Sequence, residues 1–206
     1  MKLKLATGFL AAAAMVVSTA ASAALVTFNL GGGGGNLGGS ETFSSGAYSV
    51  DARSQLRTFG SWSNSGSLRQ TSGGLGVSHF LDSAPSQVDG RSVDEGVVFS
   101  FGYGVKLTDI NLTSFGGNDD FWLYVYNGGS WSNVISQSGN ENIGAGYYGS
   151  QFRISGNGFN DEFKIGSVSF DIRRDEGPGP VAASEPASLA LLGIGALALG
   201  FSRRKA

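Results

Sequence analysis

Short stretches of alternating apolar and polar residues recur between residues 24 and 172, and clusters of Gly, Ser, Asn and Asp separate them. This pattern is typical of short β-strands joined by turns, because successive side chains of a strand point to opposite faces. No part of the region has the spacing of a long amphipathic helix. Ten strands are predicted, at residues 25–30, 47–52, 55–59, 67–71, 96–101, 106–115, 121–126, 132–136, 151–155 and 162–172.

Two of the predicted strands contain a change of face. Between residues 105 and 114 the apolar positions move from one parity to the other near Ile110. The strand at residues 162–172 shows a similar shift at Gly166. An extra residue in a strand turns the following side chains to the other face, so we expect a β-bulge near Ile110 and a register change at Gly166.

The predicted strand at residues 121–126 carries large side chains on both faces. We therefore expect it in the middle of a sheet, with Trp122, Tyr124 and Tyr126 on one side. Ten short strands around one core predict an all-β domain over residues 24–172, a jelly-roll-like β-sandwich. An N-terminal signal helix and a short C-terminal apolar helix are expected to flank it.

The first 23 residues are predicted to be a secretory signal peptide. Lys2 and Lys4 precede an apolar run at residues 5–17, and small residues follow that run. The run is shorter than the ~20 residues of a membrane-spanning helix, so we expect a cleaved signal rather than an anchor. The residues around the expected cleavage site are Ala21, Ala23 and Ala24.

A second apolar run, at residues 187–201, follows a polar linker at residues 173–183. Its 15 residues would span about 22 Å as a helix, less than the ~30 Å of a bilayer core. We expect it to insert into the membrane transiently, with the terminal cations on the cytoplasmic side. The distinctive residues around this run are Glu185, Pro186, Arg203, Arg204 and Lys205.

The tail at residues 184–206 resembles the PEP-CTERM sorting signal of exosortase-processed proteins of Gram-negative bacteria. That signal consists of Pro-Glu-Pro, a short apolar helix and an Arg-rich end; Glu185 and Pro186 match it, and Ser184 stands at the first proline. The resemblance implies signal peptidase and exosortase as partners during export. It also implies transient insertion in the inner membrane and a final location on the outer surface or outside the cell.

Residues 74–129 resemble the β-sandwich domains of exosortase-dependent surface proteins. The residues that carry this resemblance are Gly74-Leu75-Gly76-Val77, Gln87-Val88-Asp89, Asp94-Glu95 and Gly117-Asn118-Asp119-Asp120. The resemblance implies a β-sandwich displayed at the cell surface, and it implies no particular chemistry.

The composition argues against several functions. Residues 24–183 contain nine basic and fifteen acidic residues, so we expect no nucleic-acid partner. The chain has no cysteine and a single histidine, His79, which argues against thiol nucleophiles and typical zinc sites. No Gly-x-Ser-x-Gly motif is present to position a serine nucleophile. We therefore expect no enzymatic activity.

Acidic residues recur at the predicted strand starts, next to Gly or Asn. Turns favour such residues, so we interpret them mainly as solvated turn residues. Two alternatives remain open: carboxylate pairs can hydrolyse glycosides, and several oxygen ligands can bind calcium. The glycosidase candidates are Asp94, Glu95, Asp119, Asp120, Asp161 and Glu162. The calcium candidates are Asp89, Asp94, Glu95, Asp119 and Asp120.

Aromatic side chains suggest a carbohydrate contact, because a flat ring matches the apolar face of a sugar. The candidates are Trp62, Trp122 and Trp131. The sequence favours an exported structural or adhesive protein of the cell surface or extracellular matrix, with exopolysaccharide as a candidate partner. A carbohydrate-binding jelly-roll module is the alternative, and a glycoside hydrolase is a distant third.

Overall fold

The computed structural model describes residues 23–80, 82, 86–91, 93–138, 146–156 and 158–172. These residues form thirteen strands, every strand pair is antiparallel, and the described ranges contain no helix. The all-β class is thereby confirmed. The predicted signal helix, the linker at residues 173–183 and the apolar tail helix lie outside the described residues.

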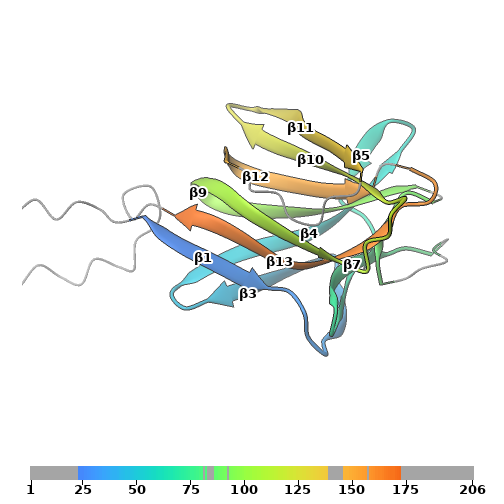
Figure 1. Ribbon diagram of the computed structural model, residues 1–206, viewed down its shortest axis with the longest axis horizontal. Coiled ribbons are helices and arrows are strands. Elements are labelled where there is room, and N and C mark those ends of the chain that lie inside the picture. Colours follow the sequence, from blue (N-terminus) through green and yellow to red (C-terminus); the bar gives the residue numbers. More distant parts are fainter. Residues whose placement is uncertain are drawn as a thin grey trace, which may run out of the picture.

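The strands follow one another along the chain with short connections (Figure 1). Their bounds are β1 Ala24–Asn29, β2 Gly35–Gly38, β3 Ser40–Ser45, β4 Tyr48–Thr58, β5 Ser61–Ser63, β6 Ser67–Thr71, β7 Gly74–Ser78, β8 Val88–Asp89, β9 Asp94–Thr113, β10 Asp120–Asn127, β11 Ser130–Ser138, β12 Tyr147–Gly156 and β13 Glu162–Ile172.

The long strand β9 takes part in both layers of a sandwich-like fold. Residues 94–100 pair with β4 on one side, and residues 96–100 pair with β12 on the other. Residues 106–113 pair with β13, which also pairs with β1. One layer therefore runs β3-β4-β9-β12-β10-β11, and the second contains β1, β13 and the end of β9. Figure 1 shows β1 and β13 crossing in front of β3 and β4.

Phenylalanine side chains hold the two layers together. Phe170 of β13 lies 5.3 Å from Phe152 of β12 and 4.6 Å from Phe101 of β9, measured between ring centroids. Near the other end of β13, Phe163 lies 6.5 Å from Phe121 of β10. All but Phe101 are completely buried, and each such side chain contributes about 1.5–3 kcal/mol through the hydrophobic effect.

Both predicted changes of face are confirmed. The pairing of β13 with β9 passes from Ser169–Asp109 to Phe170–Leu107, so Thr108 is the extra residue, two positions before Ile110. A second register shift skips Gly166. A Cβ at Gly166 would lie 2.8 Å from the Thr113 side chain, which explains glycine at this position.

The strand boundaries differ from the prediction in two ways. The segments 47–52 and 55–59 form one strand, β4, because the intervening polar Ser54 is buried and hydrogen-bonds the Gly39 carbonyl. The segments 96–101 and 106–115 likewise join as β9 through a glycine-containing bend. Five strands were not predicted, β2, β3, β5, β7 and β8. They are short, and all but the two-residue β8 are rich in Gly or Ser.

Candidate functional site

Strand β10 separates its large side chains into two sets. Phe121, Leu123 and Val125 are buried in the core. Trp122, Tyr124 and Tyr126 point to the other side of the sheet, and these three aromatic side chains are partly exposed. Because β10 pairs with β11 on one side and β12 on the other, it is an interior strand of its layer, next to the edge strand β11. The predicted central strand with its aromatic face is confirmed.

Neighbouring strands extend this row of aromatic side chains across the same outer face. The strand pairing sets Trp131 of β11 opposite Tyr126, Arg153 of β12 opposite Tyr124, and Trp62 of β5 opposite Arg57 of β4. We call this surface the aromatic–arginine face. Its members are Arg57, Trp62, Trp122, Tyr124, Tyr126, Trp131 and Arg153.

The guanidinium of Arg153 lies between two tryptophan rings. Its Cζ atom is 4.4 Å from the ring centroid of Trp62 and 4.1 Å from that of Trp131. It also lies 5.2 Å from the ring of Tyr124. Cation–π contacts within about 6 Å are worth roughly 0.5–2 kcal/mol each, so this stack fixes the two indoles relative to one another.

Two neighbours make room for the stack and orient it. The Nε–H of Arg153 donates to Gln55 Oε1 at 2.8 Å, and the amide of Gln55 donates in turn to Asn64. At Gly96 of β9, a Cβ would lie 3.2 Å from the Trp62 ring and 3.3 Å from the Arg153 stem. The missing side chain therefore lets both residues lie close to the backbone of the sheet.

The two arginines of the face differ in their charge partners. Arg57 Nη1 forms an ion pair with Asp94 Oδ2 at 3.1 Å, and the guanidinium of Arg57 lies 5.9 Å from the Trp122 ring. Arg153 is only 3% exposed and forms no ion pair within the described residues. Burial lowers the pKa of Arg153 to about 10, so it remains charged at neutral pH. The face thus contains a buried cation without a counter-charge.

Three further polar atoms on the face or directly beside it lack a hydrogen bond. Nε of Arg57, the indole Nε1 of Trp122 and the hydroxyl of the neighbouring Ser155 are buried, and none has a partner among the described residues. Ser155 stands opposite Trp122 in the pairing of β12 with β10. Buried polar groups are nearly always hydrogen-bonded, so unpaired ones call for an explanation.

The structure brings the three predicted tryptophans together, and it places Asp89, Glu95 and Asp119 of the predicted calcium ligands at one end of the domain. Asp94 belongs to the aromatic–arginine face, through its pair with Arg57. Asp119 and Asp120 lie before and at the start of β10, and Asp120 is partly exposed. Within the described residues, no group of three or more His, Asp or Glu side chains is arranged to hold a metal ion.

Several acids predicted to be solvated turn residues are in fact buried at one end of the domain. We call this group the acidic loop end; its members are Asp89, Glu95, Asp119 and Asp161, each at most 4% exposed. They accept hydrogen bonds from backbone N–H groups: Asp89 from Arg91, Glu95 from Asp89, Asp119 from Gly116 and Glu162, and Asp161 from Asp120. The bonds from Glu162 to Asp119 and from Asp120 to Asp161 join two loops that are far apart in the chain. These carboxylates cap the loops, which is why they are buried.

Glu95 has the most perturbed environment of this group. It is fully buried, its Oε2 accepts the N–H of Asp89 at 3.1 Å, and its Oε1 lies 3.6 Å from Nε2 of His79. Burial, with a smaller contribution from Asp89, raises the pKa of Glu95 to about 9. The side chain is therefore a neutral acid at pH 7 and is closed off from solvent.

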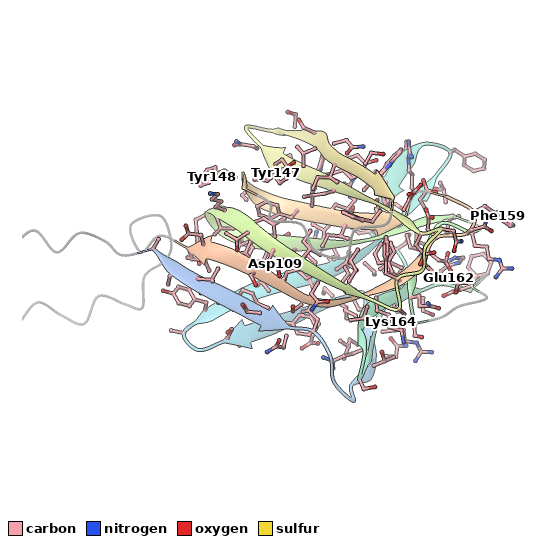
Figure 2. The ribbon with its side chains drawn as sticks, in the orientation of Figure 1. Asp109, Tyr147, Tyr148, Phe159, Glu162 and Lys164 are labelled. Carbon is pink, nitrogen blue, oxygen red and sulfur yellow. The ribbon has the colours of Figure 1, made fainter. Side chains whose placement is uncertain are left out.

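A small cavity of about 150 Å³ opens at the same end, lined by Asp89, Arg91, Asn118, Phe159, Asn160, Asp161 and Glu162. Figure 2 shows Phe159 and Glu162 at the end of the domain opposite to Tyr147 and Tyr148. Asp161 and Glu162 were predicted as glycosidase candidates. Oδ1 of Asp161 accepts the Asp120 N–H at 2.9 Å.

The sequence prediction missed Arg153, Gln55 and Gly96. A signal for Arg153 was present: residues 151–155 alternate, with Phe152 and Ile154 buried and Arg153 on the opposite parity. Only the register of β12 with β10 shows that the Arg153 side chain lies beside the aromatic side chains of β10.

A family model described as the PEP-CTERM protein-sorting motif matches residues 182–205. The chain therefore carries a sorting signal that directs export, processing by exosortase, and a cell-surface or extracellular destination. The match does not extend into the β domain. No curated protein and no solved structure matches the chain. Among the described residues, no helix is long and apolar enough to cross a membrane.

Proposed function

We propose that this exported protein is an adhesive component of the cell surface or extracellular matrix that binds carbohydrate through its aromatic–arginine face. The observation that carries the proposal is the convergence of all three tryptophans, from β5, β10 and β11, on one outer face of a sheet. Each indole is partly exposed. Flat aromatic surfaces of this kind suit the apolar faces of sugar rings.

The rigidity of the face supports a binding role. Trp62 and Trp131 are held by Arg153, which is held by Gln55, so the rings are positioned before a ligand arrives. Binding surfaces that are ordered in advance lose less conformational entropy on association. Tryptophan and arginine are also the residues most enriched at positions that dominate binding energy.

The sorting signal fits this proposal, because a protein delivered to the surface meets the polysaccharides that surround the cell. We infer that residues 1–23 are removed at Ala24 and that the tail at residues 184–206 holds the chain transiently in the inner membrane until exosortase acts. Exopolysaccharide is then the natural partner. We place the domain among jelly-roll-like carbohydrate-binding modules.

We also propose that the domain is not an enzyme. The best candidates for acid–base work, Glu95 and His79, are buried away from the aromatic–arginine face. On the face itself, the carboxylate of Asp94 is paired with Arg57. Glycoside hydrolysis requires two carboxyl groups that both reach the scissile bond, and this face offers Asp94 alone among the acids predicted as catalytic.

Binding of the purified protein to a panel of neutral and acidic oligosaccharides tests the proposal. We expect saturable binding to at least one sugar class, and we expect Trp131→Ala to weaken it about tenfold or more, the loss typical of a truncated aromatic anchor.

The matched control is Phe159→Ala, which removes an aromatic side chain that is 69% exposed at the acidic loop end. This variant should bind as the wild type does. The proposal fails if no oligosaccharide binds, or if the Phe159 and Trp131 variants lose affinity equally.

A further inference from the structure

We propose that the aromatic–arginine face binds an acidic sugar, with Arg153 pairing the anionic substituent of a ring that stacks on the tryptophans. This inference rests on the proposed carbohydrate-binding function and specifies its ligand. It begins from an unusual feature of the face, a guanidinium that is buried and has no carboxylate partner.

The environment of Arg153 is apolar on two sides. The rings of Trp62 and Trp131 cover the guanidinium at 4.4 and 4.1 Å, and the whole residue is 3% exposed. A charge moved from water into such a place is unfavourable unless it is paired and hydrogen-bonded. The ring quadrupoles offset part of this loss, but they supply no acceptor for the N–H groups.

The hydrogen bonds of Arg153 are incomplete. A guanidinium has five N–H donors, and within the described residues only the Nε–H has an acceptor, Gln55 Oε1. Neither Nη atom has an acceptor within the described residues, and neither is among the side-chain atoms that are both unpaired and fully closed off from solvent. The two Nη groups therefore keep the donors of a fork that binds a carboxylate, sulfate or phosphate.

The rest of the face does not supply that acceptor. The carboxylate of Asp94 lies on this face, but it forms its ion pair with Arg57 and not with Arg153. The Trp122 Nε1 and the Ser155 hydroxyl also lack a partner among the described residues, but both are closed off from solvent and do not serve as donors to a ligand. A face with partly exposed tryptophan rings and a cation that has no carboxylate among the described residues matches a sugar that carries an anionic group.

The test is a titration of the purified protein with three oligosaccharides of equal length: an oligogalacturonate, a neutral cello-oligosaccharide and a sulfated oligosaccharide. We expect the wild type to bind at least one of the two anionic chains about tenfold or more tightly than the neutral one. A preference for oligogalacturonate identifies a carboxylate ligand, and a preference for the sulfated chain identifies a sulfate ester.

Arg153→Met is the decisive variant, because methionine keeps an unbranched stem between the two rings and removes the charge. It should bind all three chains with nearly equal affinity. Arg91→Met is the matched control: Arg91 is exposed at the acidic loop end, so the variant changes the net charge equally without touching the stack. This control should keep the preference.

Arg153→Lys provides a second variant in case the methionine variant does not fold. Lysine keeps the charge and loses the bidentate fork, so the preference for the anionic chain should shrink while neutral binding remains. Equal wild-type affinity for neutral and anionic chains, or a preference that both Arg153 variants retain, would overturn the inference and leave carbohydrate binding intact. Absence of binding to every chain would instead overturn the proposed function.

Discussion

The aromatic–arginine face and the acidic loop end both bury charged or ionisable side chains, and they differ in how those groups are paired. Asp119 of the acidic loop end accepts the backbone N–H groups of Gly116 and Glu162, and Asp161 accepts that of Asp120, so these carboxylates fix two loops to each other. Arg153 of the aromatic–arginine face has one side-chain hydrogen bond and no ion pair within the described residues. A buried carboxylate that caps a loop is explained by the fold alone, whereas a buried cation without a partner is not.

The comparison teaches that burial alone does not identify a site. The acidic residues recur at the predicted loops, and the sequence left calcium binding and glycoside hydrolysis open as alternative roles for them. Asp89, Glu95, Asp119 and Asp161 accept backbone hydrogen bonds that connect the loops at this end. The tryptophans instead remain partly exposed, and the Nη groups of Arg153 have no acceptor within the described residues.

The largest effect on stability is expected from Asp161→Ala. Asp161 is 3% exposed and accepts the N–H of Asp120 at 2.9 Å, so alanine leaves that N–H unpaired in a buried setting. We expect a loss of about 1–3 kcal/mol, measured by thermal unfolding, with unchanged sugar affinity at temperatures where the variant is folded.

The control for this variant is Asp51→Ala. Asp51 is exposed and bonds the Thr42 hydroxyl at the surface, so the change should stay within about 0.5 kcal/mol. If Asp161→Ala weakened sugar binding as strongly as Trp131→Ala, the functional separation of the two regions would be wrong.

A smaller effect, visible as a pH dependence, is expected at Glu95. Its pKa is about 9 in the folded protein because of burial, and about 4.3 in an unfolded chain. Between these values the unfolded state releases a proton that the folded state keeps, so stability falls as pH rises from about 4.5 to about 9. Glu95→Gln cannot ionise and should remove part of this fall, on the order of 1 kcal/mol or more.

Melting curves from pH 5 to pH 9 measure this effect, with the exposed Glu41→Gln as the control for loss of a surface charge. Asp89 contributes to the fall in the same direction, because burial also raises its pKa. The slope should therefore decrease in Glu95→Gln without vanishing. An unchanged slope would mean that Glu95 is ionised in the folded protein, which contradicts a pKa raised by burial.

Much of the fold could be predicted from local patterns, because alternation is a property of each strand. The central strand at residues 121–126 and the shifts near Ile110 and Gly166 follow from side-chain parity alone. The continuity of β9 could not be predicted, since Gly102 and Gly104 resemble turn residues in the sequence. Whether such glycines end a strand or bend it depends on partners far away in the chain.

The candidate site was predictable only in part, for the same reason. The three tryptophans are conspicuous as residue types, but their meeting depends on the registers of β10 with β11 and of β4 with β5. The alternation at residues 151–155 shows which face Arg153 is on, but it does not show that the aromatic side chains of β10 lie beside it. The burial of Asp89 was misjudged because acids next to glycine are usually solvated.

Intrinsic tryptophan fluorescence provides the most direct test of the proposed binding face. The chain has three tryptophans, and all of them belong to the aromatic–arginine face, so their emission reports on this surface alone. Titration of the purified protein with an acidic oligosaccharide should change the emission saturably, and Arg153→Met should weaken that change. Emission that stays constant with every acidic and neutral oligosaccharide up to millimolar concentration would contradict the account.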